Sequence, residues 1–362
     1  MTAAIIGLGT SLPASVTQEE SLEHAAPLTC DNVRQKRILE ELYKRTDIKS
    51  RSSVLISRDG SAKHTYKLYE PRTSANNLGP TTRQRMQSFE EKIGPLAAEA
   101  ARKALSGALL SPDMVTHLIT VSCTGFFAPG FDVGLINGLP LNPDVARSHL
   151  GFMGCHGALN GIRLASAIAS SDPEARILIC AAELCTLHFQ YGWLADNLVA
   201  NSLFADGAAA LVVGTHSNTT GNAWTIRSSA STILPNSNEV MRWQIGDNGF
   251  TMVLSPKLPD LVFEHLPSWL NGWLAGCGLT VSDIASWAIH PGGPRILDAV
   301  ADALSLSPEL MSPSRQALSH YGNMSSPTVL FILENLRRDT EGSPCVMLVF
   351  GPGLAFEASL II

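Results

Sequence analysis

Two stretches of this 362-residue chain resemble each other and decide its fold. The first is GFMGCHGALNGIRLASAIASSDPEARILICAAE (residues 151–183), and the second is GNMSSPTVLFILENLRRDTEGSPCVMLVFG (residues 322–351). In each stretch a polar residue beside a glycine opens a helical pattern. A continuous apolar run, typical of a strand buried on both faces, begins 22 residues after Cys155 in the first and after Asn323 in the second. The shared spacing indicates that a βαβ-type unit is duplicated.

The repeat extends upstream of both stretches. Cys123 ends a predicted strand 32 residues before Cys155, and His290 ends another 33 residues before Asn323. Because strands alternate with helices, the pattern predicts an α/β fold of two duplicated halves with mixed sheets. The predicted strands span residues 3–8, 117–122, 176–182, 208–213, 287–290, 345–350 and 355–361, and the predicted helices span residues 90–105, 156–170, 259–274 and 326–338.

The boundary between the halves is predicted in the polar, turn-rich stretch 214–221. We therefore assign residues 1–217 to a first half that carries the cysteine, and residues 218–362 to a second half that carries the histidine and the asparagine. Residues 31–90 and 232–262 are rich in charge, proline, serine and asparagine, and are interpreted as insertions.

Composition excludes several classes of protein. Hydrophobic residues make up 45% of the chain and charged residues 16%, which is typical of a globular protein and excludes intrinsic disorder. The net charge of −6, from 26 basic and 32 acidic residues, does not favour nucleic-acid binding. Seven cysteines without a CxxC spacing favour neither a disulfide scaffold nor a zinc ribbon. The N-terminus lacks the pattern of a signal peptide and no apolar run reaches membrane-spanning length, so we expect a cytoplasmic protein without membrane insertion.

Three residues in matched positions favour acyl transfer through a thioester. We expect Cys155 at a helix N-terminus, where the helix dipole favours the nucleophilic thiolate; the alternative is a buried structural cysteine. His290 follows a predicted strand and precedes a Pro-Gly-Gly break, so it can serve in acid–base chemistry or in structure. The amide of Asn323 can donate to an oxyanion, or the side chain can cap a helix. Two duplicated halves that face each other would bring Cys155, His290 and Asn323 together, which favours a catalytic role for all three residues.

The motifs around these residues resemble the type III polyketide synthases, a chalcone synthase-like superfamily of thiolase-fold condensing enzymes. The similar segments are GCHGALNGIR around Cys155, LFADGAAALVVG around Phe204, IHPGGPRILD around His290, YGNMSSPTVLFIL around Asn323 and FGPGLAFE at residues 350–357. The resemblance implies a five-layered αβαβα fold and a homodimer. It also implies that Cys155 takes an acyl group from a starter acyl-CoA, while His290 and Asn323 bind malonyl-CoA and stabilise the enolate formed by its decarboxylation.

The resemblance further implies a substrate cavity. Phe204 matches the family's gatekeeping phenylalanine, which the sequence alone would place in the core, and Met252 stands where a second phenylalanine is usual. Ser325 is retained beside Asn323, whereas Ala128 replaces a methionine that crosses the dimer interface in plant members. The cavity wall carries residues that differ from the plant enzymes, namely Cys123, His188 and Trp243, so we expect a partly filled cavity.

A cluster of cations is predicted to bind the phosphates of CoA; the alternative is a solvated helix face. Its members are Lys44, Arg45, Lys49 and Arg51, with Arg295 near the histidine loop. No cofactor or metal is expected beyond the CoA thioester substrates.

The predicted function is that of a type III polyketide synthase. It would condense a starter acyl-CoA with malonyl-CoA and cyclise the product to a pyrone, a resorcinol or a related phenolic. The alternatives are a ketoacyl-ACP synthase III-like enzyme that performs one condensation, and a catalytically inactive homologue.

Overall fold

The computed structural model describes residues 2–57, 65–215, 224–338 and 343–362. The predicted boundary between residues 217 and 218 lies outside these ranges. Within them, nine strands form one mixed sheet in the order β13-β14-β15-β10-β1-β9-β8-β6-β7.

The first half contributes five strands to this sheet, and the second half contributes four. The first five are β1 (Ala3–Ser11), β6 (His117–Ser122), β7 (Ala146–Gly151), β8 (Ile177–Leu184) and β9 (Asp206–Thr215). The other four are β10 (Trp224–Ile233), β13 (Ser286–Ile289), β14 (Cys345–Gly351) and β15 (Ala355–Ile361). The two predicted sheets are joined, because β1 and β10 pair through Ala4 with Thr225 and Ile5 with Trp224.

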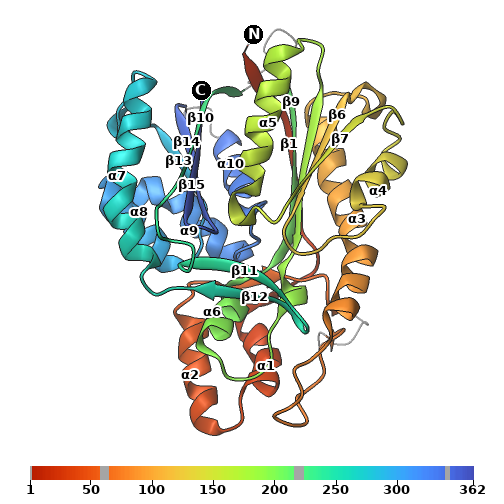
Figure 1. Ribbon diagram of the computed structural model, residues 1–362, viewed down its shortest axis with the longest axis vertical. Helices are drawn as coiled ribbons and strands as arrows, with labels where there is room; N and C mark the ends of the chain where they lie inside the picture. Colours follow the sequence, from red (N-terminus) through yellow and green to blue (C-terminus); the bar gives the residue numbers. More distant parts are fainter. Residues whose placement is uncertain (1, 58–64, 216–223, 339–342) are drawn as a thin grey trace.

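Helices cover the sheet in three layers, which confirms the predicted αβαβα arrangement (Figure 1). Helices α3 (Thr82–Gly107) and α4 (Phe131–Gly138) cover the first half on one side, and α7 (Leu258–Gly276) and α8 (Pro294–Leu304) cover the second half on the other. Helices α5 (Gly157–Ser171) and α10 (Thr328–Arg338) lie between the halves and share one apolar core with strands of both. The duplicated helices therefore form the middle of the molecule.

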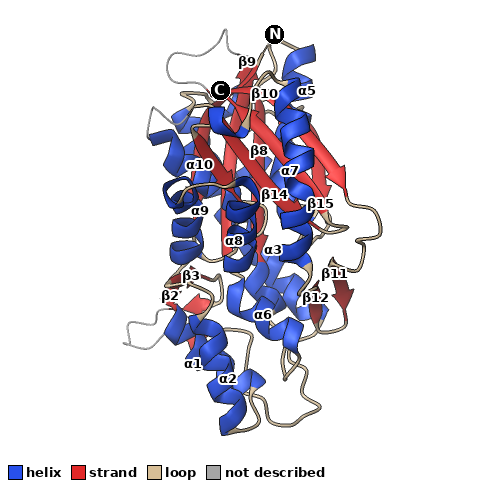
Figure 2. Cartoon of the chain, turned by 90° about the vertical axis from the view of Figure 1, so that its left-hand side faces the viewer, coloured by secondary structure: helices blue, strands red, loops and turns tan. Residues whose placement is uncertain are grey.

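The segments interpreted as insertions gather at one end of these layers, opposite the two chain ends (Figure 2). They include α2 (Val33–Lys44) and the hairpin of β11 (Met241–Gly246) and β12 (Gly249–Leu254), which lie near α1 (Gln18–Thr29) and α6 (Ala195–Leu203). The remaining elements are β2 (Ser15–Thr17), β3 (Ser50–Ser52), β4 (Ile56–Ser57), β5 (Thr65–Tyr66) and α9 (Pro308–Tyr321).

The insertion prediction is wrong at its end, because α3 begins at Thr82 rather than near residue 90. The side chain of Thr81 accepts from the backbone N–H of Gln84, whose side chain accepts in return from the N–H of Thr81, and this capping box starts the helix early. Among the described helices, none is both long and apolar enough to cross a bilayer.

Candidate active site

The turn that carries Cys155 is held between the two halves of the molecule. A short 3₁₀ turn, Gly154–His156, precedes α5 and contains the cysteine. Gly154 has a φ of 75°, and a Cβ at this position would lie 2.3 Å from Cδ of Pro352 in the second half. Only glycine meets both requirements, so this turn fixes Cys155 at the contact between the halves.

The thiol of Cys155 is buried, and its surroundings favour the protonated form. Burial raises its pKa to about 12, and the hydroxyl of Ser325, with Oγ 3.6 Å from the sulfur, opposes this rise only in part. Burial therefore acts against the thiolate that the helix N-terminus is expected to favour. A base must take the proton when the cysteine reacts.

His290 directly follows β13 and is the candidate base. Its backbone N–H donates to the carbonyl of Leu348 at 2.8 Å, which fixes the residue at the strand end. The side chain is 1% exposed, yet neither ring nitrogen has a hydrogen-bond partner among the described residues. Burial, together with the nearby His156, lowers the pKa of His290 to about 3, so the imidazole is neutral and its nitrogens are open to a substrate.

The side chain of Asn323 is aimed by its own turn. Its Oδ1 accepts from the backbone N–H of Ser325 at 2.8 Å, which leaves the Nδ2 amino group to donate elsewhere. The backbone of Asn323 pairs with the other half, where Leu203 and Ala205 flank Phe204. The helix-capping alternative does not hold, because α10 begins at Thr328 and the side chain caps none of its N–H groups.

These three residues line one space, which we call the outer cavity. It has a volume of about 500 Å³, and Phe204 and Met252 form part of its wall. Arg45 and Arg295 also line it, and both are exposed. The outer cavity thus joins a nucleophile, a neutral histidine and an amide donor to two cations.

A second, much smaller space also has Cys155 in its wall, and we call it the central chamber. Its volume is about 20 Å³, and its wall includes Cys123, Cys185, Trp243 and Ser325. The indole of Trp243 donates to the carbonyl of Cys123 at 2.7 Å, so the ring is held in place. A space of this size holds little more than one water molecule. This agrees with the expectation that larger side chains partly fill the cavity.

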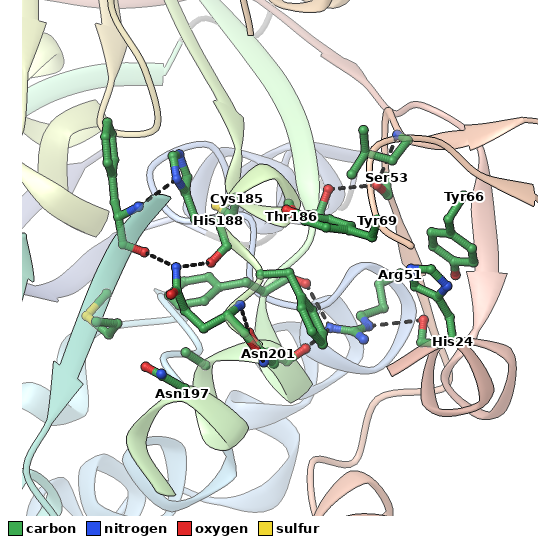
Figure 3. Close-up of a pocket in the computed structure, with 18 of the residues that line it drawn as sticks. His24, Arg51, Ser53, Tyr66, Tyr69, Cys185, Thr186, His188, Asn197 and Asn201 are labelled. Carbon is green, nitrogen blue, oxygen red and sulfur yellow. Dashed lines mark hydrogen bonds between the residues drawn. The ribbon is translucent and has the colours of Figure 1, made fainter. Parts of the chain in front are cut away.

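Figure 3 shows a third space, which we call the inner pocket. Its volume is about 60 Å³, and it shares Cys185, Phe204, Trp243 and Met252 with the chamber. His188 lines this pocket and not the chamber. Its ring stacks on Phe250 with 4.1 Å between centroids, and burial lowers its pKa to about 3. His188 is therefore a neutral part of an aromatic wall.

The structure separates the predicted CoA-binding cations. Lys49 lines a different hollow, together with Arg315 and His320. Lys44 is exposed and pairs with Glu41 at 3.0 Å. Arg51, predicted to bind CoA phosphate, does not line the outer cavity. It lines the inner pocket, where its guanidinium donates to the carbonyls of Asn201 and Phe204.

Sequence reasoning missed Glu183, a wholly buried carboxylate on β8. It accepts from the backbone N–H of Cys123 at 2.9 Å and from the hydroxyl of Thr124 at 2.7 Å, both in the first half. It also accepts from the hydroxyl of Ser326 at 2.8 Å, in the turn that carries Asn323. Burial nevertheless raises the pKa of Glu183 to about 7. The signal in the sequence was a charged residue inside the apolar run ILICAAEL.

Family models match almost the whole chain. The N-terminal domain of the chalcone and stilbene synthases matches residues 1–217, and their C-terminal domain matches residues 225–362. The chain belongs to the chalcone and stilbene synthase family. It is a type III polyketide synthase, and hence an enzyme of the acyltransferase type.

Relatives and solved structures agree with this assignment. Type III polyketide synthase C of Arabidopsis thaliana is 33% identical over 373 residues, which cover 99% of this chain and 94% of the relative. The α-pyrone synthesis polyketide synthase-like protein Pks18 of Mycobacterium tuberculosis is 32% identical over 366 residues. The match covers 99% of this chain and 90% of the relative. The crystal structure of PKS-I from the brown alga Ectocarpus siliculosus superposes with a TM-score of 0.92 at 29% identity, over 99% of this chain and 98% of the other.

Proposed function

We propose that this polyketide synthase condenses a starter acyl-CoA with malonyl-CoA through a thioester on Cys155, and releases a short polyketide that closes to an α-pyrone. The observation that carries the proposal is the single outer cavity on which Cys155, His290 and Asn323 meet. Arg45 and Arg295 on the same cavity suit the phosphates of CoA. The chemistry needs no cofactor beyond the CoA thioesters.

Loading of the starter begins with the neutral imidazole of His290, which accepts the proton of the Cys155 thiol as the sulfur attacks the thioester carbon. The bond from that carbon to the CoA sulfur breaks, and the imidazolium returns its proton to the leaving CoA thiolate. CoA departs as the thiol, and the acyl group remains on Cys155.

Extension uses His290 again, now together with Asn323, at the carbonyl of malonyl-CoA. The thioester oxygen of malonyl-CoA accepts from the N–H of neutral His290 and from Nδ2 of Asn323. Loss of CO₂ leaves the electron pair in the enolate that these donors stabilise. The enolate carbon attacks the acyl group on Cys155 and frees the cysteine sulfur, so the lengthened chain is a β-ketoacyl-CoA.

The size of the central chamber supports a short product. Trp243 and Met252 occupy space beside Cys155, and about 20 Å³ remains. The β-ketoacyl group returns from CoA to Cys155 by the loading step and is extended once more. In the resulting chain, the enol oxygen of the starter-derived carbonyl attacks the thioester carbon, the bond to the CoA sulfur breaks, and CoA leaves as the thiol with the enol proton, which closes a six-membered lactone. The name of the mycobacterial relative, which refers to α-pyrone synthesis, agrees with this product class.

We also propose that the enzyme is a homodimer. Strand β7 forms one edge of the sheet and is largely exposed, and Phe126, Phe152 and Met153 near it are exposed apolar side chains. A second copy that covers this edge would bury both features. Analytical ultracentrifugation should then give twice the chain mass, and Phe126→Glu should shift the protein towards the monomer.

Mass spectrometry of the products tests the proposed reaction. Incubation with a panel of acyl-CoAs and malonyl-CoA should give pyrones with two added C₂ units, and intact-protein mass should show the starter on the enzyme. Cys155→Ala should remove both signals, whereas Cys345→Ala, a buried cysteine in β14 away from the cavities, should keep them. Full acylation of the Cys155→Ala protein would overturn the proposal.

A further inference from the structure

The inner pocket combines an apolar wall with polar groups that neither step of the proposed reaction uses. The wall consists of aromatic side chains such as Tyr69, Phe189 and Phe250. Figure 3 shows Arg51 and His24 beside each other at one end of the pocket, and Asn197 at the other. Cys185, Phe204, Trp243 and Met252 line both the pocket and the central chamber, so an acyl group on Cys155 must pass between these side chains to enter the pocket.

Arg51 brings a positive charge to the pocket without a counter-charge. It is 8% exposed, and no carboxylate of the described residues forms an ion pair with it. Its Nη1 donates to the carbonyls of Asn201 at 2.7 Å and Phe204 at 2.9 Å, and its Nε donates to the hydroxyl of Ser21 at 3.3 Å. These acceptors are all neutral, and the guanidinium also lies over the ring of Tyr43, 5.5 Å from its centroid, so the charge has favourable contacts but no negative partner among the described residues.

His24 adds an unused polar atom next to that charge. Its ring stacks on Tyr66 with 3.7 Å between centroids, and its Nε2 is buried without a hydrogen-bond partner in the described structure. Burial, together with the charge of Arg51, lowers the pKa of His24 to about 4, so the ring is neutral. With its proton on Nε2, it donates a hydrogen bond without adding a charge.

The carboxyl group of Asp206, which bonds to Thr186 in the pocket wall, forms no ion pair with Arg51. Asp206 accepts from the backbone N–H and the hydroxyl of Thr186, at 2.8 and 2.6 Å, and from the backbone N–H of Val54 at 2.9 Å. Burial raises the pKa of Asp206 to about 6. Its oxygens are occupied by these donors, which leaves the charge of Arg51 available to a ligand.

We propose that the inner pocket binds the far end of the starter acyl group, and that Arg51 and His24 select an acyl group that ends in a carboxylate. The aromatic wall would hold the methylene chain, and the carboxylate would supply the missing counter-charge. This inference rests on the proposed function, because it needs an acyl group on Cys155. It names the substrate class as the CoA thioesters of dicarboxylic acids.

The test compares acyl-CoAs that differ only at the far end. Pairs with four to ten carbons, ending in a methyl group or a carboxylate, are offered without malonyl-CoA, and acylation of Cys155 is followed by intact-protein mass. We expect equal loading for the shortest pair. Once the chain is long enough to reach the inner pocket, we expect the carboxylate-ended acyl-CoA to acylate Cys155 at least about tenfold faster than the methyl-ended one. This ratio is that expected for a charge-assisted hydrogen bond.

Two variants test whether Arg51 and His24 cause the preference for carboxylate-ended chains. Arg51→Gln and His24→Phe should each bring the ratio of carboxylate-ended to methyl-ended loading close to one at the preferred length, and His24→Phe retains an aromatic ring to stack on Tyr66. Glu23→Gln changes the exposed neighbour of His24 on α1 and should leave the ratio as it is. If Arg51→Gln does not fold, as judged by circular dichroism, His24→Phe alone decides the question.

Failure of the inference is distinct from failure of the proposed function. If butyryl-CoA does not acylate Cys155, the proposed function falls. If it does, but methyl-ended chains load as well as carboxylate-ended chains at every length, only the inference falls. Equal loading of hydroxyl-ended chains would also overturn it, since a neutral acceptor would then suffice.

Discussion

At the scale of single residues, one backbone hydrogen bond gives Asn323 its role. Because Oδ1 is occupied by the N–H of Ser325, the Nδ2 group is the part of the amide left to bind the malonyl thioester oxygen. We therefore expect Asn323→Ala to slow malonyl-CoA decarboxylation by about 10²- to 10³-fold, as for the loss of one oxyanion donor. Release of CO₂ from labelled malonyl-CoA measures this step, and loading of Cys155 should remain within about threefold of the wild type.

Asn142 offers a matched control for this variant. Its Oδ1 accepts from the backbone N–H of Asp144 at 2.9 Å, also two residues along the chain, but the residue is exposed and lines none of the three cavities. Asn142→Ala should leave both steps unchanged. Equal losses of loading and decarboxylation in Asn323→Ala would contradict the role assigned to the amide.

Trp243 limits the space beside Cys155. Its indole fills the wall between the central chamber and the inner pocket and packs against His188 at 5.5 Å and Phe250 at 5.8 Å between centroids. Trp243→Gly should join the two spaces and shift the products, seen by mass spectrometry, towards chains with one or more additional C₂ units. Trp243→Phe loses the bond to the carbonyl of Cys123 but keeps most of the volume, so it should retain the short product. Longer products from Trp243→Phe alone would show that the hydrogen bond, rather than the volume, sets chain length.

At the scale of elements, the 3₁₀ turn before α5 depends on its glycine. Gly154 combines a left-handed φ of 75° with close approach to Pro352. Gly154→Ala should lower the free energy of unfolding by about 1–3 kcal/mol and displace Cys155, with a matching loss of acylation. Urea denaturation and intact-protein mass measure the two effects.

Gly134 in α4 is the matched control for this turn. A Cβ at Gly134 would meet no atom within 4 Å, and the residue is helical. Gly134→Ala should be neutral or stabilise the protein by about 0.4–1 kcal/mol. A Gly154→Ala protein as stable and as active as wild type would show that the turn tolerates a side chain.

Elements of the central layers could be predicted from the sequence, and those at the end of the molecule could not. Strands β6, β14 and β15 and helices α5 and α7 lie within two residues of their predicted bounds, because continuous apolar runs and glycine turns mark them. Helices α1 and α2 carry few buried residues, and α1 has Pro27 inside it. The hydrophobic period of α1 is weak, and α2 lies in the charged stretch 31–90 that is interpreted as an insertion.

At the scale of the whole molecule, the duplication explains what sequence could say about the site. Cys155 and Asn323 stand at equivalent helix starts, so their meeting follows from two halves that face each other. The inner pocket has no such signal, because His24, Arg51 and Trp243 come from α1, β3 and β11, which are far apart in the chain. A cation-rich stretch near residue 45 suggested phosphate binding, and only the packing shows that Arg51 turns inward.

Glu183 accepts hydrogen bonds from both halves, and its titration makes the stability of the folded protein depend on pH. Its carboxyl has a pKa of about 7 in the folded protein, against an ordinary value of 4.5, because burial disfavours the charged form. Between these pH values the folded protein holds a proton that the unfolded chain has lost. The resulting stabilisation is complete below pH 4.5 and is lost as the pH rises through 7, by about 3 kcal/mol in total.

Glu183→Gln removes this titration and keeps a polar group between Cys123 and Ser326. We expect the wild type to lose about 3 kcal/mol relative to Glu183→Gln between pH 4.5 and 8, measured by urea denaturation at each pH. The buried histidines titrate in the opposite sense, since their lowered pKa values make stability rise with pH, but they are present in both proteins and cancel in the difference. A comparison of wild type with Glu23→Gln, on the exposed face of α1, should give parallel curves. Parallel curves for Glu183→Gln as well would mean that the buried carboxyl is not the group that couples the two halves to pH.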